Sequence, residues 1–297
     1  MQRREFLAKS CVMGAASLSG GALLAQERMA PVPRQPNETE AAYRVRLAQI
    51  RAAYAAAAQA RANAESSRLY YELRRYEIET EAQKAGFDKF AGEAALPALN
   101  RQGIEPVGVF YPNEGLSPIY VLLPHPSLES FATLTLRLGE DEGFLEKGAD
   151  FLNAPASAPA YKNLEVQLMA AFMGMPKLER PTEAPTRIFQ LRTYESPSEK
   201  TGLKKIEMFN TAEIAVFRKV GLHPVFFGQT LAGTKMPNLT YMLGFQDMEE
   251  SKANWKKFGA DPDWQKLRAM PEYADKAILR EKGITNLYLK PAGYSQI

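Results

Sequence analysis

Two short stretches of this sequence carry the same polar and aromatic side chains, and these side chains could bind a small molecule. The stretch "YYELRRYE" at residues 70–77 returns as "IFQLRTYE" at residues 188–195, an offset of 118 residues. An arginine beside tyrosine hydroxyls can hold a small anion or carboxylate, and a buried tyrosine can serve as a proton donor. The candidate site residues are Glu72, Arg74, Tyr76, Tyr120, Gln190, Arg192, Tyr194 and Tyr241.

The same arginines also have a purely structural interpretation. Arg74 could pair with Glu72 or Glu77, and Arg192 could pair with Glu195. Exposed or cross-strand pairs of this kind contribute little to stability, about 0–1 kcal/mol each. A duplication would copy the pattern whether or not it is used, so the sequence leaves both interpretations open.

Other kinds of active site find little support in the sequence. The only histidines, His125 and His223, lie at unrelated places, and no histidine or carboxylate cluster has the spacing of metal ligands. There is no Gly-x-Ser-x-Gly, no P-loop and no Gly-x-Gly-x-x-Gly after a strand, and the single cysteine is Cys11. We therefore predict no metal site and leave the cofactor unknown. A haem with one axial histidine stays open, without a positive signal.

The repeat continues beyond the two strands that carry the candidate site. "GIEPV" at 103–107 returns as "GLHPV" at 221–225 with the same offset. "IYVLL" matches "TYMLG" with an offset of 121, which aligns Tyr120 with Tyr241. Each copy then reads as a period-two strand, a helical segment, two strands, a helical segment and a last apolar stretch.

This order of elements predicts an α+β fold. It describes two ferredoxin-like β-α-β-β-α-β domains in tandem, at residues 68–182 and 187–297. One such domain leaves a face of its sheet bare, and two copies can cover each other's open faces.

Alternation along the first strand of each copy divides its residues between two faces of the sheet. In the first copy Tyr71 and Leu73 share one face with Arg75, while Glu72, Arg74 and Tyr76 share the other. We expect the apolar face to pack under the helices. The polar face would then point to solvent or into a cavity between the two sheets.

Three stretches of the chain, "YELRRYEIE", "FQLRTYESPSEK" and "NWKKFGADPDWQKL", resemble the NIPSNAP family. The resemblance extends through residues 187–297, whereas the first copy matches in its strands and lacks the tryptophans of "NWKKFGADPDWQKL". It implies the dimeric α/β-barrel version of the ferredoxin-like fold, formed here by two sheets of one chain that face each other. It implies little chemistry, because the family has no agreed catalytic residues to carry over.

The N-terminal part of the chain has a different character. Residues 1–25 place Arg3 and Arg4 before a short apolar run, which is the layout of a signal peptide of twin-arginine type and is too short to span a membrane. Residues 26–67 are predicted to form a proline-containing linker and an alanine-rich helix. We therefore predict a chain exported to the periplasm or another extracytoplasmic compartment, with the twin-arginine export machinery as a partner and no stable membrane anchor.

The net charge excludes one class of partner. The formal value of +3 falls to +1 when three cations and one anion leave with residues 1–25, and such a chain offers no electrostatic footprint for nucleic acid. Our first hypothesis is an exported protein that binds a small, partly apolar anionic molecule between the two sheets. The alternatives are a cofactor-independent oxygenase or isomerase of the dimeric α/β-barrel kind, and a protein that binds a partner through the alanine-rich helix. Whether the chain is an enzyme and whether it forms a homo-oligomer stay open.

Overall fold

The computed structural model describes residues 32–297 and divides after Ser67 into two compact units. The predicted signal peptide, residues 1–25, lies outside the described residues. In the first unit, helix α2 (Glu40–Ser67) occupies the alanine-rich segment, in keeping with its high helix propensity. No helix within residues 32–297 combines the length and the apolar character that a membrane span needs.

The segment before α2 folds back along the first turns of the helix. Tyr43 donates a hydrogen bond to the carbonyl oxygen of Val32 at 3.0 Å, and Arg46 donates to both carboxylate oxygens of Glu38 at 2.7 Å. These hydrogen bonds from Arg46 lower the pKa of Glu38 to about 2. Side-chain contacts rather than burial therefore hold this segment, since most of α2 is exposed.

The second unit, Arg68–Ile297, contains two halves with the same succession of strands and helical regions. The first half consists of β1 (Tyr70–Glu77), α3 (Glu81–Lys89), α4 (Leu96–Arg101), β2 (Gly108–Pro112), β3 (Ile119–His125), α5 (Leu128–Gly139), α6 (Glu142–Lys147), α7 (Ala149–Leu152) and β4 (Asn163–Ala171). The second half consists of β5 (Ile188–Glu195), α8 (Glu199–Met208), α9 (Ile214–Val220), β6 (His223–Ala232), β7 (Asn238–Phe245), α10 (Met248–Ala260), α11 (Pro262–Arg268), α12 (Asp275–Ile278) and β8 (Ile284–Pro291). A π-helical segment joins the first two helices of each half, at Phe90–Ala95 and at Phe209–Glu213.

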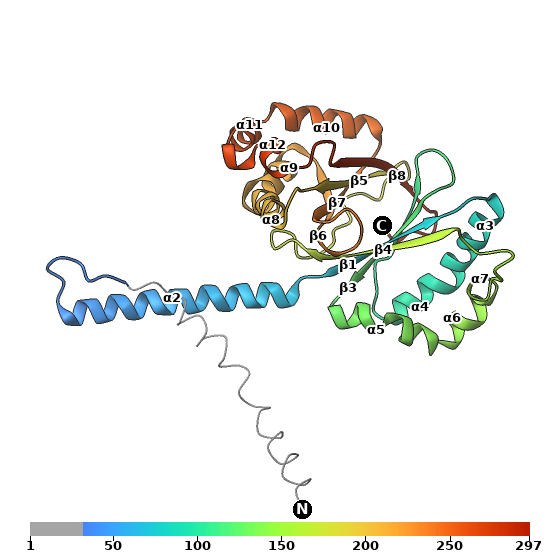
Figure 1. The fold of residues 1–297 in the computed structure, drawn as a ribbon, viewed down its shortest axis with the longest axis horizontal. Helices are drawn as coiled ribbons and strands as arrows, with labels where there is room; N and C mark the ends of the chain where they lie inside the picture. Colours follow the sequence, from blue (N-terminus) through green and yellow to red (C-terminus); the bar gives the residue numbers. More distant parts are fainter. Residues whose placement is uncertain (1–31) are drawn as a thin grey trace, which may run out of the picture. The chain divides into compact units, whose positions relative to one another are not determined.

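The eight strands close into one antiparallel barrel in the order β1-β3-β2-β8-β5-β7-β6-β4. The two halves meet where β2 pairs with β8 and where β4 pairs with β6, so each strand has a neighbour on both sides. Figure 1 shows helices α3 to α7 of the first half on one side of the strands and α8 to α12 of the second half on the other. The fold is therefore a mixed α+β barrel, and the predicted class is confirmed at this level.

The barrel strands bury side chains on both of their faces. The cluster inside the barrel draws on all eight strands and includes Tyr71, Leu73 and Phe189. Two further clusters lie between the strands and the helices, and Tyr76 and Tyr194 belong to them. Our prediction that the face of Tyr71 and Leu73 packs under the helices is therefore wrong: that face turns into the barrel, and the other face lies under the helices. Both locations stabilise the fold, since full burial of a large apolar side chain contributes about 1.5–3 kcal/mol.

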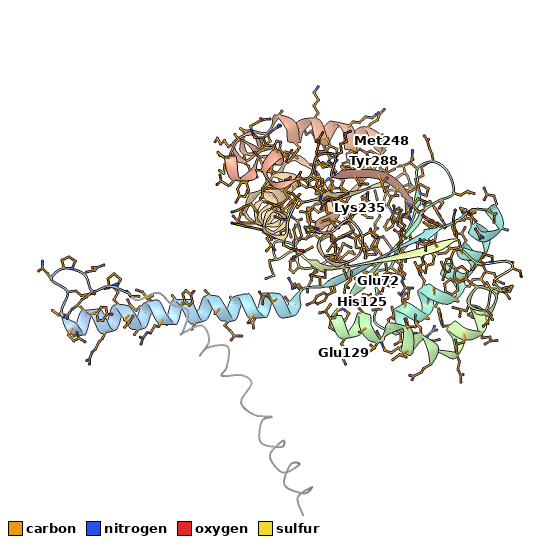
Figure 2. The ribbon with its side chains drawn as sticks, in the orientation of Figure 1. Glu72, His125, Glu129, Lys235, Met248 and Tyr288 are labelled. Atoms are coloured by element: carbon orange, nitrogen blue, oxygen red, sulfur yellow. The ribbon has the colours of Figure 1, made fainter. Side chains whose placement is uncertain are left out.

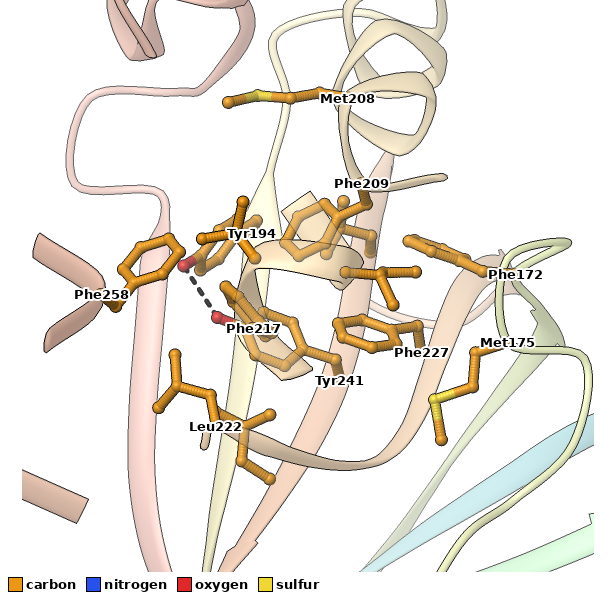
Figure 3. Packing of buried hydrophobic residues seen from close by; sticks show 14 of the residues in the cluster. Phe172, Met175, Tyr194, Met208, Phe209, Phe217, Leu222, Phe227, Tyr241 and Phe258 are labelled. Atoms are coloured by element: carbon orange, nitrogen blue, oxygen red, sulfur yellow. Dashed lines mark hydrogen bonds between the residues drawn. The ribbon is translucent and has the colours of Figure 1, made fainter. Parts of the chain in front are cut away.

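Figure 3 shows the core beneath the helices of the second half. Phe209, Phe217 and Phe258 pack with Tyr194 and Tyr241, whose hydroxyl groups share a hydrogen bond of 2.9 Å. Phe217 and Phe258 meet edge to face with their ring centroids 5.0 Å apart, a favoured arrangement of aromatic rings. Each buried hydroxyl thus finds its partner in the other, as buried polar groups require.

Candidate functional site

The barrel contains a cavity of about 420 Å³. Leu73, Leu191 and Leu287 form its apolar wall, and Arg75 and Tyr120 contribute polar groups from β1 and β3. Arg75 faces the interior because it lies two residues after Leu73 in the same strand. The alternation that turns the apolar face of β1 inward therefore also brings a guanidinium into the barrel.

The charges that line this cavity are paired. Nη1 of Arg75 lies 2.7 Å from Oε1 of Glu77 and 3.4 Å from Oε1 of Glu165. Lys235, a second cation of the lining, lies 3.6 Å from Glu195. The side chains of Glu77 and Glu165 are 30% and 41% exposed, so the cavity reaches solvent where these carboxylates stand.

Protonation in the cavity follows from these contacts. Burial lowers the pKa of Arg75, but the hydrogen bond to Glu77 and nearby anionic groups outweigh burial and raise it overall. Burial raises the pKa of Tyr120, and the charge of Arg75 opposes that shift without cancelling it. At neutral pH the cavity thus presents a charged, paired guanidinium and a phenol that keeps its proton.

Amide and hydroxyl groups form a connected network in the cavity wall. Nε2 of Gln167 donates to Oγ1 of Thr230 at 2.7 Å and to Oγ1 of Thr240 at 3.0 Å. The hydroxyl of Thr240 also shares a hydrogen bond of 2.9 Å with Thr193. The network joins β4, β5, β6 and β7, so a bound molecule would meet a wall that is already in place.

The first three predicted site residues lie under the helices of the first half and not in the barrel cavity. Nε of Arg74 donates to Oε1 of Glu72 at 2.6 Å, so the structural interpretation holds for this arginine. Burial raises the pKa of Glu72, but the hydrogen bond from His125 and the charge of Arg74 outweigh it, so the pKa of this carboxyl lies below its ordinary value. Tyr76 is 5% exposed and belongs to the apolar core beside Phe87.

The second set lies under the helices of the other half, with a different arrangement. The guanidinium of Arg192 stacks on the ring of Trp255 at 4.7 Å, and its Nη2 donates to the hydroxyl of Tyr194 at 3.1 Å. Among residues 32–297 no carboxylate lies within 4.0 Å of this guanidinium, and the pair with Glu195 that the sequence suggested is wrong. Nε of Arg192 is buried without a hydrogen-bond partner in the described part of the chain.

One difference between the two copies explains why Arg192 has no anionic partner. The position of Glu72 in the first copy holds Gln190 in the second, and a neutral amide cannot balance a guanidinium. Gln190 bonds elsewhere: its Nε2 donates to Asn286 at 2.8 Å, and its Oε1 accepts from Nε1 of Trp255 at 2.7 Å. Trp255 therefore joins helix α10 to the sheet.

The strand register separates Tyr120 from Tyr241, which the sequence repeat had aligned. Tyr120 pairs with Arg75 in β1, whereas Tyr241 pairs with Arg192 in β5. The residue of the second half that corresponds to Tyr120 is Thr240, one position earlier. Because a shift of one residue reverses the face of a strand, Tyr120 points into the cavity and Tyr241 lies under the helices.

Of the eight predicted site residues, only Tyr120 lines the barrel cavity, and Arg75, which also lines it, was not among them. The signal was present, since Arg75 alternates with Arg74 along β1, but its counterpart in the second copy is Thr193 and the repeat did not draw attention to it. Within the described residues, no three histidine, cysteine or acidic side chains come together as a metal site would require.

Residues 189–296 match the sequence model of the NIPSNAP family. This match confirms the resemblance that the sequence predicted for this part of the chain. Among curated proteins, none matches the sequence.

Several solved structures resemble the barrel. A candidate monooxygenase from Fusobacterium nucleatum has a TM-score of 0.50 and 8% identity, over 76% of this chain and 93% of its own. A second one, from Lactobacillus acidophilus, has a TM-score of 0.50 and 7% identity, over 75% of this chain and 94% of its own. A NIPSNAP-like domain protein from Burkholderia xenovorans has 20% identity over 37% of this chain and 89% of its own, with a TM-score of 0.33. The first two show the fold and nothing of the chemistry, and the third adds no argument.

Proposed function

We propose that this chain, whose residues 189–296 match the NIPSNAP family, binds a small, partly apolar molecule in the cavity of its barrel. The observation that carries the proposal is a cavity of about 420 Å³ with leucines on one wall and hydrogen-bonding groups beside them. Binding sites for small molecules commonly combine an apolar lining with a few placed polar groups.

The charge of the cavity favours a ligand whose polar end is neutral over the anion that the sequence suggested. Arg75 already faces Glu77 and Glu165, and an anion bound to it would stand beside both carboxylates. A hydroxyl, carbonyl or amide group can accept from Tyr120 or Arg75 without that repulsion. The apolar part of the ligand would lie against Leu73 and Leu191.

Catalysis is the second candidate, and the cavity supports it less well. A cofactor-independent oxygenase or isomerase needs a base near its substrate. Glu77 and Glu165 are both paired with Arg75, and the raised pKa of Tyr120 keeps its proton in place at neutral pH, so the phenol cannot act as that base. The candidate monooxygenases support only the fold at 7–8% identity, so we place binding before catalysis.

We also propose three further features of the chain. Two ferredoxin-like domains in tandem, at 68–182 and 187–297, are supported by the matching element order and by the π-helical segment at the same place in each half. Export through the twin-arginine machinery rests on the sequence of residues 1–25. A partner-binding role of α2 rests on its exposed surface, where Val45 and Tyr54 are 59% and 47% exposed.

A neutral, polarity-sensitive dye tests the binding proposal. N-phenyl-1-naphthylamine should gain fluorescence with the wild-type chain, because its rings would enter an apolar cavity. Thr285→Phe should weaken dye binding by about tenfold or more, since Thr285 lines the cavity and the larger ring fills it. The matched control is Ile284→Phe, the preceding residue of β8, which is 43% exposed and points away from the barrel. Equal binding by the two variants would contradict the proposal.

A further inference from the structure

A chain of three side chains connects β1, β3 and α5 in the first half, outside the barrel cavity. Oε2 of Glu72 lies 3.0 Å from Nε2 of His125, and Nδ1 of His125 lies 3.2 Å from Oγ of Ser130. Figure 2 shows Glu72 and His125 beside α5. Glu72 and His125 are 3% and 0% exposed, whereas Ser130 is half-buried.

The partners of these groups determine where the protons are. Glu72 is ionised because its pKa is lowered, so it can only accept, and in the tautomer of His125 that serves as a base the proton between the two groups is on Nε2. Nδ1 is then free to accept a proton from Ser130. Nη2 of Arg137 lies 3.4 Å from Oγ of Ser130 and can only donate to it. The hydroxyl hydrogen of Ser130 is thereby directed toward His125.

This arrangement has the parts of an activated serine. Such a site needs a hydroxyl within reach of a base, and a third group that orients the base. Glu72 orients His125 through Nε2, and the ring of Phe131 stands edge-on to the imidazole at 5.7 Å. The hydrogen bond with His125 and the charge of Arg74 together outweigh burial and hold the pKa of Glu72 below its ordinary value.

The second half shows that the fold does not need this chain of side chains. His125 of β3 pairs with Tyr70 of β1, and Phe245 of β7 pairs with the corresponding Ile188 of β5, so Phe245 takes the place of His125. The third residue after the N-cap is Ser130 in α5 and Glu250 in α10. The positions equivalent to the three residues hold Gln190, Phe245 and Glu250. The same sheet and helix thus form with an apolar ring in place of the histidine, so packing alone does not account for the group.

Donors for a developing oxyanion are present in the same turn. The backbone N–H groups of Leu128 and Glu129 have no acceptor among residues 32–297, because they begin α5 and the N-cap Ser127 accepts from Ser130 instead. Together with Arg137 they could stabilise negative charge beside the serine. Leu128 is 45% exposed and offers an apolar contact at the surface.

We propose that Ser130 is the nucleophile of a hydrolytic site for short acyl esters, with His125 as its base and Glu72 as the group that orients the base. Oγ of Ser130 forms a bond to the acyl carbon, its proton moves to Nδ1 of His125, and the ester C–O bond breaks as the leaving alcohol takes that proton. Water then attacks the acyl carbon, giving one proton to Nδ1. The bond to Oγ breaks and Ser130 regains its proton, so that ester and water become acid and alcohol.

The test uses the full chain with diisopropyl fluorophosphate and 4-nitrophenyl acetate. We expect one diisopropylphosphoryl group per chain, mapped to Ser130 by peptide mass spectrometry, and ester hydrolysis that the reagent abolishes. Ser130→Ala should remove both. His125→Phe, which introduces the residue of the second half, should slow labelling by about 100-fold or more. Thr133→Ala is the matched control, because this hydroxyl of α5 donates to the backbone oxygen of Glu129 and not to His125.

Two results would overturn the proposal. One is a wild-type chain that takes up no label, or takes it up equally at other serines. The other is a folded His125→Phe variant that is labelled at the wild-type rate. If circular dichroism shows that His125→Phe does not fold, the labelling rate is measured on Glu72→Gln instead, since glutamine occupies that position in the second half. An unchanged labelling rate of this variant would equally reject the proposal.

Discussion

The two arginines that the sequence repeats at the same strand position should differ in what their removal costs. Arg74 donates to Glu72, whose side chain is 4% exposed, and the side chain of Arg74 itself is 23% exposed. Arg192 stacks on Trp255, and within residues 32–297 no carboxylate lies within 4.0 Å of it. Arg74→Met and Arg192→Met form a matched pair, because methionine keeps much of the apolar stem and removes the charge.

The expected cost of each substitution follows from what it leaves behind. Removing one member of a buried ion pair costs about 3–5 kcal/mol, and because His125 still donates to Glu72 we expect about 3 kcal/mol for Arg74→Met. Arg192→Met leaves no anion without a partner and loses a cation–π contact of about 1 kcal/mol. The free energies of unfolding of the two variants should therefore differ by about 2 kcal/mol at neutral pH.

Urea unfolding at neutral and at acidic pH measures this difference. Burial raises the pKa of Glu72, but its contacts with His125 and Arg74 bring the folded value below the ordinary 4.5. A lowered folded pKa contributes stability above the unfolded value, and this contribution disappears as the pH falls through the folded value. The cost of Arg74→Met should shrink in acid and that of Arg192→Met should not. Equal costs at neutral pH, or a larger cost at Arg192, would show that the buried pair of Arg74 and Glu72 does not set the difference.

Three further predictions concern other groups of the chain. Lys205→Met leaves the buried carboxylate of Glu213 without the ammonium at 3.0 Å and should cost about 3–5 kcal/mol of unfolding free energy in urea. Adding Glu213→Leu should restore the stability to within about 1 kcal/mol of the wild-type value. A double variant as unstable as the single one would contradict this. Arg46→Ala should raise the pKa of Glu38 from about 2 toward 4.5 in an NMR titration, and an unchanged value would show that Arg46 does not hold it. Tyr120→Phe should weaken binding of the cavity ligand about fivefold by removing one hydrogen bond of about 1 kcal/mol, as calorimetry would show, and equal affinity would remove Tyr120 from the site.

The sequence predicted the elements of the barrel well because strand and helix periodicities are local signals. It could not say which face of β1 turns inward, because both faces are buried: Tyr71 lies in the barrel and Tyr76 under the helices. Alternation divides the residues of a strand between two faces, but the pattern tells which face is exposed to solvent only where one face carries polar residues. In β3 and β7 every residue is buried, so these strands carry no such mark.

The candidate site was harder to predict because it depends on register. A one-residue error in matching Tyr120 to Tyr241 placed two residues together that lie on opposite faces of the sheet. The repeat also favoured residues that recur, although the cavity uses Arg75, whose counterpart is Thr193. The two copies differ at the position of Glu72 and Gln190, and this difference indicates more about the chemistry of each copy than the residues that they share.

Native mass spectrometry of the chain purified from its own host shows whether the barrel cavity holds a small molecule. We expect extra mass that is released on denaturation in the wild-type chain and in Ile284→Phe, and that is missing from Thr285→Phe. A ligand lost through one inward-facing residue and kept through its outward-facing neighbour would place it in the cavity. A wild-type chain of bare mass, or a ligand that Thr285→Phe retains, would contradict binding in the cavity.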